Sequence, residues 1–216
     1  MTRSAFLRAR RPEHKQQRRE AILRAARELA AASGVRNVSL GAVAEAVGLA
    51  KSNIVRYFGT REEIYLHLAT EEGLRWAEAV GARLRTATGP AEVVATLAET
   101  LAERPLLCDL LGHASTSLEH NVSVESARAY KRAAHAESAA VGRQIAERTD
   151  LTESEGAELA AAAIAFAGLL HPIANPPPTI VRLYAEDPDL AAACPEFTPT
   201  LVRMLSALAA GLPRLR

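Results

Sequence analysis

GLAKSNIVRYFGTREEI, residues 48–64, is the stretch of sequence that decides the fold. It places a short helix-forming segment, residues 51–58, after a glycine and a two-residue link. In that segment only Ile54 and Phe58 have the character of core residues. The other side chains form a basic, hydroxyl and amide face, which comprises Lys51, Ser52, Asn53, Arg56 and Tyr57. We therefore expect this short helix to contact another molecule.

Helix signals surround this segment on both sides. Residues 20–33 place apolar side chains at helical spacing, and Gly34 follows where a left-handed cap belongs. Ser39 is a candidate N-cap of a second helix, which Gly48 ends. Thr60 is a candidate N-cap of a long helix with glutamates in its first turn. Two short helices joined by a glycine-bearing turn predict a helix-turn-helix.

The rest of the chain also has helical periodicity, and no stretch sustains the period-two alternation of a strand. Further helices are expected over residues 91–103, 105–119, 122–149, 153–171 and 198–211. The expected fold class is all-α, with an N-terminal three-helix helix-turn-helix head and a larger helical bundle. We divide the chain into a basic arm (1–14), the head (15–60) and the body (61–216).

The net charge of +1 conceals a strong asymmetry. Residues 1–61 carry 13 Lys and Arg against 4 Glu, whereas residues 62–216 carry 13 Lys and Arg against 21 Asp and Glu. A basic head on an acidic body favours a polyanion-binding segment joined to a part that does not bind polyanions. Charge alone is equally compatible with a solvated basic helix.

Composition also bears on the location of the protein. The start of the chain lacks the apolar segment of a secretory signal. The longest apolar stretch, residues 159–174, is shorter than the about 20 residues of a membrane span. Cys108 and Cys194 lie far apart, so a disulfide framework is not expected. We expect a cytoplasmic protein without a membrane partner.

Double-stranded DNA would explain the exposed face of the short helix. The major groove accepts one α-helix and displays a distinct pattern of donors and acceptors for each base pair. Lys51 is placed to reach a guanine or a phosphate, and Ser52 and Asn53 are placed to contact base edges. Arg56 and Tyr57, toward the far end, are better placed for phosphates.

Residues outside the short helix are expected to hold the DNA backbone. Ser39 and Thr60, with the free amides at their helix starts, can bind phosphates from either side, helped by Arg61. Sequence-independent attraction would come from Arg8, Arg10, Arg11, Lys15, Arg18 and Arg19. Spacing alone would also fit an ordinary compact helical domain, and the charge asymmetry favours the DNA-binding interpretation.

This part of the chain resembles the DNA-binding head of the tetracycline-repressor (TetR/AcrR) family of bacterial transcription regulators, over roughly residues 15–70. The matching positions, in order and spacing, are Ser39, Gly48, Lys51, Ser52, Asn53, Ile54, Tyr57, Phe58, Arg61 and Glu62. Val55 and Arg56 depart from the pattern, since an aromatic residue is frequent there. Either a guanidinium supplies that phosphate contact or a different DNA sequence is bound. The resemblance implies an obligate dimer, a palindromic operator, and release from DNA when a small molecule occupies the C-terminal domain.

Binding a two-fold DNA site requires two heads about one helical turn, ~34 Å, apart. The body is therefore expected to contain a homodimer contact, and residues 156–170 and 198–212 are the candidates because their Ala and Gly allow close approach. The larger apolar side chains there are Phe166, Leu169, Leu201, Met204, Leu205 and Leu208. The resemblance places such helices in an intersubunit four-helix bundle, while the same stripes could instead form intramolecular core.

An effector pocket is expected in the body, with mostly apolar surroundings that favour a small hydrophobic or amphipathic ligand. The candidate lining residues are Trp76, Arg104, Cys108, Asp109, His113, Ser117, Tyr130, Phe166 and His171. Asp109 and His113 are four apart, a spacing that a metal site or an ion pair allows. A metal site needs three or four ligands, so an ordinary contact is the better interpretation. We expect no metal and no cofactor.

Two other function classes fit the sequence less well than a regulator does. An enzyme would need an oriented nucleophile–base pair, a phosphate-binding glycine loop or a metal cluster, and the sequence contains none of these patterns. A sequence-non-specific or architectural DNA-binding protein would explain the basic head but would leave the acidic body without a role. We therefore predict a dimeric, ligand-responsive transcriptional repressor and keep the architectural protein as the alternative.

Overall fold

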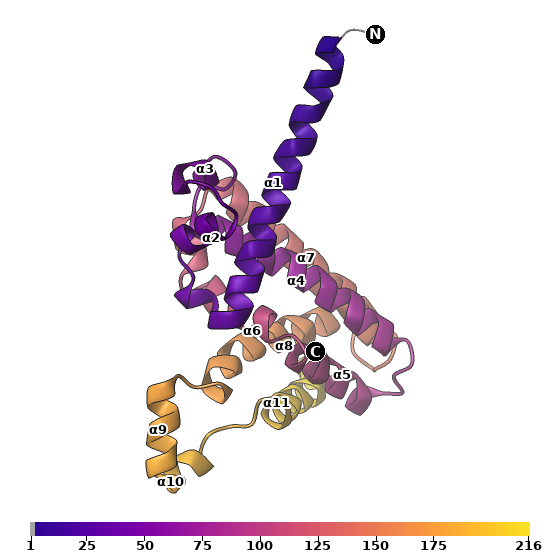
Figure 1. Ribbon diagram of the computed structural model, residues 1–216. Coiled ribbons are helices and arrows are strands. Elements are labelled where there is room, and N and C mark those ends of the chain that lie inside the picture. The colour runs from indigo at the N-terminus through magenta and orange to yellow at the C-terminus, as the bar shows by residue number, and fades with distance from the viewer. Residues whose placement is uncertain (1–2) are drawn as a thin grey trace.

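The computed structural model describes the backbone of residues 3–216 and the side chains from residue 14 on. Within residues 3–216 every regular element is a helix, so the all-α prediction is confirmed. Figure 1 shows the long helix α1 beside the short helices α2 and α3, a helical body, and a pair of helices, α9 and α10, that projects from this body.

The head begins with α1 (Arg3–Ser33) and continues through η1 (Val35–Asn37), α2 (Leu40–Ala46) and α3 (Lys51–Val55). The expected border between arm and head falls inside α1. α3 is shorter than predicted because residues 56–58 form a turn. Gly34 and Gly48 have φ angles of 83° and 64°, which glycine adopts without steric cost, and they follow α1 and α2 where the sequence predicted.

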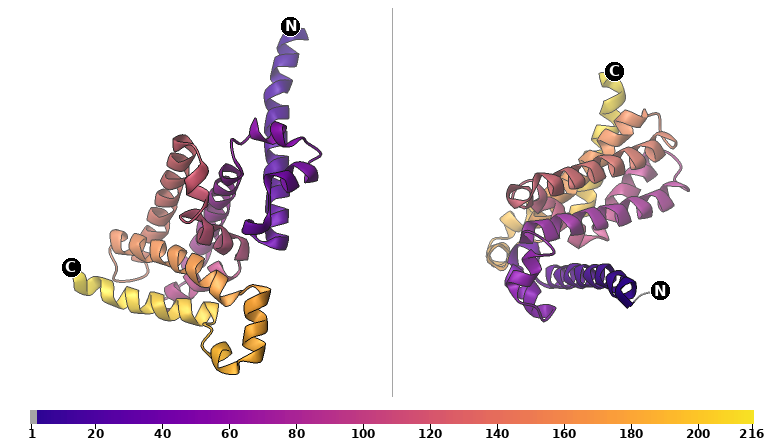
Figure 2. Two further views of the ribbon diagram at one scale, coloured as in Figure 1. Left: turned by 90° about the vertical axis from the view of Figure 1, so that its left-hand side faces the viewer. Right: turned by 90° about the horizontal axis from the view of Figure 1, so that it is seen from above.

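The long helix α4 (Arg61–Leu84) leads from the head into the body. The body helices are α5 (Pro90–Ala102), α6 (Pro105–Ala114), η2 (Leu118–Asn121), α7 (Val124–Ala146), α8 (Glu153–Ala174), α11 (Phe197–Gly211) and η3 (Leu212–Leu215). The expected helix over residues 105–119 is wrong in its second half, since a turn separates α6 from η2. Seen from above, α4 and α7 run side by side (Figure 2).

The head does not have a core of its own. Ile22, Val43 and Ile54 from the head pack in one cluster with Leu68 of α4 and Leu110 of α6. A second cluster fills the body around Trp76, Leu97, Leu101, Leu159 and Leu205. Because α4 and α6 contribute to the first cluster, the head and the body are joined by direct packing.

α7 and α8 approach each other closely at two glycines. A Cβ atom added to Gly142 would lie within 3.0 Å of the backbone nitrogen of Ala157, and one added to Gly156 would lie within 3.0 Å of the carbonyl oxygen of Gly142. Both glycines are buried. The absence of side chains here therefore sets the distance between the two helices.

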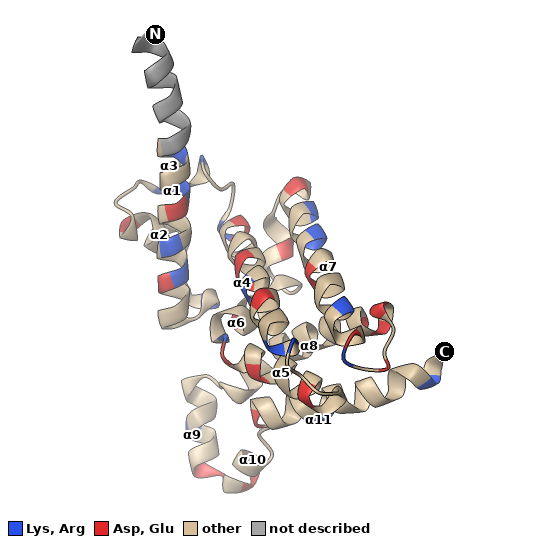
Figure 3. Cartoon of the chain, turned by 90° about the vertical axis from the view of Figure 1, so that its right-hand side faces the viewer, with Lys and Arg blue, Asp and Glu red and all other residues tan. Residues whose placement is uncertain are grey.

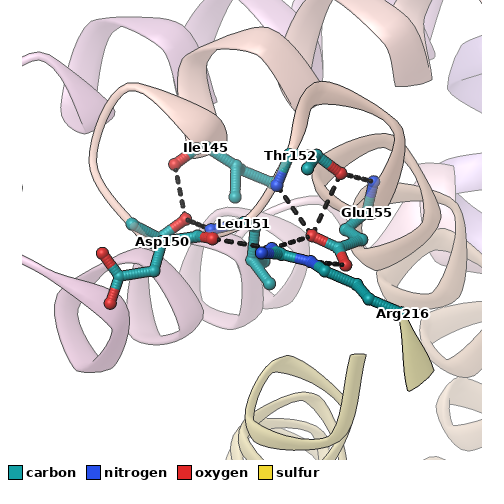
Figure 4. Close-up of polar contacts among 7 residues, drawn as sticks. Ile145, Asp150, Leu151, Thr152, Glu155 and Arg216 are labelled. Atoms are coloured by element: carbon teal, nitrogen blue, oxygen red, sulfur yellow. Dashed lines mark hydrogen bonds and ion pairs between the residues drawn. The ribbon is translucent and has the colours of Figure 1, made fainter. Parts of the chain in front are cut away.

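The start of α8 is fixed by a capping box, shown in Figure 4. Thr152 Oγ1 accepts a hydrogen bond from the Glu155 backbone nitrogen at 3.3 Å, and Glu155 Oε2 accepts one from the Thr152 nitrogen at 2.7 Å. Arg216 adds hydrogen bonds of 2.8 and 2.6 Å to the two carboxylate oxygens. The hydrogen bonds from Arg216 and Thr152 lower the pKa of Glu155 to about 2.

The C-terminal third contains two short helices that were not predicted. α9 (Pro178–Glu186) and α10 (Pro188–Ala192) form between residues 171 and 198, where no helix is expected from the sequence, and each has proline at its first position. α8 has 22 residues and is the one described helix long and apolar enough to cross a membrane. Core helices of globular proteins meet the same criterion, and Leu159, Ala160 and Ala163 of α8 are fully buried in the body cluster.

Candidate nucleic-acid interface and ligand cavity

Two buried side chains anchor α3 and leave its polar face free. Ile54 is fully buried and Phe58 is 2% exposed. The exposed residues of this segment are Lys51, Ser52, Asn53, Val55 and Arg56, and Tyr57 is half-buried. α3 therefore presents to solvent the basic and amide side chains that the sequence predicted for DNA contact.

Local hydrogen bonds set the turn that carries α3. Ser39 Oγ accepts a bond from the backbone nitrogen of Ala42 at 3.1 Å, which makes Ser39 the N-cap of α2 as predicted. The nitrogen of Leu49 donates to the carbonyl oxygen of Ala44 at 2.9 Å and closes the turn after Gly48. Ser39 is exposed on the same head as α3.

A hollow of about 410 Å³ lies between α1 and the α3 segment. Its lining residues are Lys15, Leu49, Asn53, Arg56 and Tyr57. Two of these five side chains are basic, and no carboxylate lines the hollow. The concave surface next to α3 is therefore suited to an anionic group.

Arg61, which was predicted to contact phosphate, is engaged within the head. Its Nε donates a hydrogen bond of 2.6 Å to the carbonyl oxygen of Val38, and an Nη atom donates to the carbonyl oxygen of Val35. Its guanidinium also lies 4.7 Å from the ring centre of Tyr65. Arg61 is half-buried and joins the start of α4 to the loop between α1 and α2.

Thr60 is likewise engaged within the protein. Its Oγ1 accepts a hydrogen bond from the Glu63 nitrogen at 3.1 Å and donates one to the carbonyl oxygen of Asn121 at 2.8 Å. Thr60 is the N-cap of α4, as predicted, but its hydroxyl connects α4 to η2 rather than standing free for a phosphate.

Glu63 strengthens this junction between head and body. Its carboxylate accepts hydrogen bonds from Ser123, Ser126 and Gly59 at 2.9–3.0 Å. Burial opposes ionisation of the group, but the hydrogen bonds from these residues outweigh it and lower the pKa of Glu63. The first turn of α4 is thus fixed both to the turn after α3 and to the start of α7.

Arg19, expected to attract DNA, also turns inward. Its guanidinium lies 4.1 Å from the ring centre of Phe58, donates to the carbonyl oxygen of Tyr57 at 3.1 Å and contacts His67 Nε2. Burial, followed by the nearby Arg19 charge, lowers the pKa of His67. Lys15 and Arg18 are exposed as expected, and the side chains of Arg8, Arg10 and Arg11 lie outside the described residues.

Two further polar contacts join the head to the body. Arg27 of α1 donates a hydrogen bond of 3.0 Å to Glu72 of α4. Figure 3 shows basic and acidic residues distributed along these two helices. Asp109 of α6 accepts a hydrogen bond of 2.7 Å from the Val35 nitrogen. Asp109 was expected to line a pocket, but it supports the head instead.

The predicted effector residues do not form one site. Trp76 and Tyr130 line a cavity of about 40 Å³ between α4, α6, α7 and α8. Cys108 is buried against the carbonyl oxygen of Leu101, and burial raises the pKa of its thiol to about 12. The remaining candidates, which do not line this cavity, are Arg104, Asp109, His113, Ser117, Phe166 and His171.

Asp109 and His113 form an ordinary local contact. Asp109 Oδ1 lies 3.5 Å from His113 Nε2 on the adjacent turn of α6. In the part of the chain that the structure describes, no group of three or more His, Cys, Asp or Glu residues is arranged to hold a metal ion.

A second cavity, of about 280 Å³, adjoins the first, because Thr70 and Tyr130 line both. It lies at the junction of head and body, where Arg19, Phe58 and His67 form part of its wall. Apart from Trp76 and Tyr130, the residues of the two cavities were not predicted, because the cavities arise from the packing of α4 against α7, about 60 residues apart in sequence. The helical spacing of Thr70, Gly73 and Trp76 on α4 is the one signal that pointed to a common face.

The predicted dimer residues divide into two groups. Leu201 and Leu205 are fully buried in the core of the single chain, so the prediction that they contact a partner is wrong. Leu169 is 59% exposed on α8. Phe166, Met204 and Leu208 are half-buried.

Comparison with known families and structures matches nearly the whole of the described chain. Residues 22–68 match the family described as bacterial regulatory proteins, tetR family, and residues 70–214 match the tetracyclin repressor-like C-terminal domain. No curated protein matches the sequence.

Three solved structures share the fold. The fatty acid degradation regulator FadR from Bacillus halodurans has a TM-score of 0.54 and 15% identity, with 89% of this chain and 97% of that chain covered. Thermus thermophilus FadR, a repressor in complex with lauroyl-CoA, has a TM-score of 0.55 and 21% identity, with 90% and 92% covered. RolR in complex with resorcinol has a TM-score of 0.55 and 17% identity, with 92% and 95% covered.

Two observations identify the family. The head is a helix-turn-helix with the exposed basic helix α3, and the body matches the C-terminal domain of the family over most of its length. The chain belongs to the tetracycline-repressor family of transcription regulators.

Proposed function

We propose that the protein is a repressor that binds a palindromic DNA operator as a homodimer and leaves it when a small molecule occupies the body. The observation that carries this proposal is the exposed face of α3, where Lys51, Ser52, Asn53 and Arg56 project from a helix anchored by Ile54 and Phe58. Five residues of helix with such side chains fit the major groove, in which a base pair is identified by its donors and acceptors.

Phosphate contacts would come from residues around α3. Arg56, Lys15 and Tyr57 line one hollow beside this helix, and a phosphate seated there would meet two cations. We assign Arg61 no phosphate contact, because its guanidinium donates hydrogen bonds to the head backbone. The DNA contacts of this chain therefore concentrate on α3 and on the solvent side of α1.

The homodimer contact is proposed on the outer faces of α8 and α11. Leu169 and Ile173 are 59% and 41% exposed on α8. α11 contributes half-buried Met204 and Leu208 next to an open groove lined by Pro199, Thr200 and Arg203. Exposed large apolar side chains of this kind are typical of a surface that is covered in the assembled protein. An isologous contact would relate the two heads by a two-fold axis, as a palindromic site requires.

The release mechanism is proposed to act through α4. Its middle lines the cavity between Trp76 and Tyr130, and its first turn holds the turn after α3 through Glu63 and Gly59. A ligand that fits the cavity in only one position of α4 would favour that position over the DNA-binding one. His113, which was expected to take part, lies outside this cavity. Lauroyl-CoA and resorcinol, bound by two structural relatives, are precedents for small-molecule ligands on this fold.

Selection of duplexes from a random DNA pool by the purified protein tests this function. Enrichment of one inverted repeat, bound by two copies of the chain, supports the repressor. Binding without any enriched sequence, and with affinity that falls steeply as salt rises, would instead support the architectural alternative. If the selected operator were bound equally well with and without every ligand that occupies the cavity, the release mechanism would be contradicted, whereas operator binding would not.

A further inference from the structure

Glu137 is a buried carboxylic acid that the fold leaves without a partner. It lies on α7, is 7% exposed, and its Oε1 atom is buried without a hydrogen-bond partner. Burying a polar group without such a bond costs roughly 1–3 kcal/mol, so an orphaned acid is expected only where it has a use. Burial raises the pKa of Glu137 to about 7.

The carboxyl group faces the cavity that Trp76 and Tyr130 line. Glu137 and Gly73, on facing helices, both belong to the cavity wall. A Cβ atom on Gly73 would lie within 3.0 Å of Glu137 Oε2 and 3.2 Å from Cδ. The missing side chain at Gly73 therefore leaves the space in which the carboxyl group sits against α4.

A larger cavity at the junction of head and body shares two wall residues, Thr70 and Tyr130, with the cavity around Glu137. The inner cavity around Glu137 has a volume of about 40 Å³ and adjoins the outer cavity of about 280 Å³ at Thr70 and Tyr130. Together they reach the lower end of the size of small-molecule pockets, about 300 Å³. Ser126, at the outer end, precedes Glu137 by about 16 Å along α7 at the rise of an α-helix.

The carboxylates that line the two cavities favour a cation. Glu63 and Glu125 line the outer cavity. Arg19, on the same wall, is already directed onto Phe58 and the carbonyl oxygen of Tyr57. The inner walls are apolar apart from Glu137 and the hydroxyl groups of Thr70 and Tyr130. A cationic group that reached the inner cavity would meet apolar walls and the single carboxyl group of Glu137.

From this arrangement we propose that the effector site of this protein takes a molecule with an apolar body and a primary amine, and that Glu137 binds the ammonium group. The inference rests on the proposed ligand-responsive function and specifies the ligand class for its site. An ammonium next to the carboxyl group favours the ionised form, so the proton of a neutral Glu137 leaves to solvent on binding. The resulting ion pair satisfies the oxygen that the empty protein leaves without a partner.

Decylamine, decanol and decanoate are suitable probes, because they share an apolar chain and differ in the end group. Trp76 is the only tryptophan and lines the inner cavity, so its fluorescence reports occupancy directly. With the full-length protein, below the concentrations at which the probes form micelles, decylamine should bind at least about tenfold more tightly than decanol and decanoate.

Two variants separate this role from general damage. Glu137→Gln should remove the preference for decylamine over decanol while leaving decanol binding unchanged, and Glu147→Gln, an exposed position at the end of the same helix, should keep it. Gly73→Ala should weaken decylamine binding by crowding the carboxyl group. Thermal melting of each variant confirms that it is folded.

Equal binding of the three probes to the natural protein, or an unchanged preference in folded Glu137→Gln, would overturn the proposal. The repressor function is judged separately by duplex selection in the absence of any ligand. A chain that selects an operator but does not prefer the amine contradicts only this inference. A chain that prefers the amine and selects no operator contradicts only the proposed function.

Discussion

Arg61 Nε donates a hydrogen bond of 2.6 Å to the carbonyl oxygen of Val38, and this bond joins the first turn of α4 to the loop before α2. The same guanidinium donates to the carbonyl oxygen of Val35 and lies over the ring of Tyr65. A residue at the edge of the recognition motif is therefore part of the head's framework.

Arg61→Ala should lower the free energy of unfolding without changing the salt dependence of DNA binding. Hydrogen bonds from a charged group contribute about 1.5–3 kcal/mol each, so the loss of the two bonds to the head backbone should cost roughly 3–6 kcal/mol. Urea unfolding measures the stability, and Arg36→Ala, an exposed neighbour in η1, is the control. If Arg61→Ala were as stable as the natural chain and its DNA binding depended less on salt, by about one phosphate contact, Arg61 would belong to the DNA interface.

Gly142→Ala should destabilise the body strongly, because its Cβ atom would lie within 3.0 Å of the Ala157 backbone nitrogen. Backbone cannot move aside as the end of a side chain can, so a loss of about 3 kcal/mol or more in the free energy of unfolding is expected. Gly211→Ala is the matched control, since a Cβ atom there meets nothing within 4 Å. If Gly142→Ala melted at the same temperature as the control, α7 and α8 would not be packed as closely as described.

Arg216→Ala should raise the pKa of Glu155 from about 2 toward its ordinary value, since Arg216 is the main cause of the depression. A depressed carboxyl pKa contributes stability that is present above its unfolded value, about 4.3, and is lost as pH falls through about 2. Arg216→Ala should lack this contribution to stability. Acid should therefore unfold the variant at a higher pH than it unfolds the natural chain. A carbon-detected NMR titration of the Glu155 carboxyl group follows the pKa directly, with Arg214→Ala as the control. An unchanged titration of Glu155 in Arg216→Ala would show that the ion pair does not form in solution.

Leu169→Asp should weaken the proposed homodimer. The side chain is 59% exposed on α8, so the single chain tolerates the charge, whereas a contact with a second copy would bury it twice by symmetry. A loss of about 2 kcal/mol or more, over tenfold in the dimer Kd, is expected in sedimentation equilibrium. Leu215→Asp, at an 82% exposed position beyond α11, should leave the dimer intact. Equal dimerisation of the two variants would place the contact elsewhere.

The helices and their caps could be predicted from sequence because they depend on local signals. Ser39 and Thr60 are the N-caps of α2 and α4, and Gly48 ends α2 with a positive φ. Ile54 and Phe58 are the buried anchors of the α3 segment. Each of these features follows from residue type and spacing over a few positions.

The features that could not be predicted from the sequence depend on contacts between segments that are distant in the chain. Arg61 and Arg19 are basic residues in a basic head, and only the fold shows that backbone carbonyls and the Phe58 ring receive them. Leu201 and Leu205 belong to an apolar stripe, and the sequence of such a stripe does not distinguish the core of one chain from a dimer surface. Glu137 was missed because a glutamate on a polar helix has no periodic signal of burial.

The central claim is that α3 identifies DNA bases, and parallel duplex selections by the natural protein and by Lys51→Ala test it most directly. The natural protein should enrich one inverted repeat with half-sites about 34 Å apart. Lys51→Ala should relax the base preference at one position in each half-site, at a cost of about 1–3 kcal/mol in discrimination, while random-sequence binding changes little. Identical enriched sequences from the two proteins, or no enriched sequence from either, would contradict the assignment of α3 as the recognition helix.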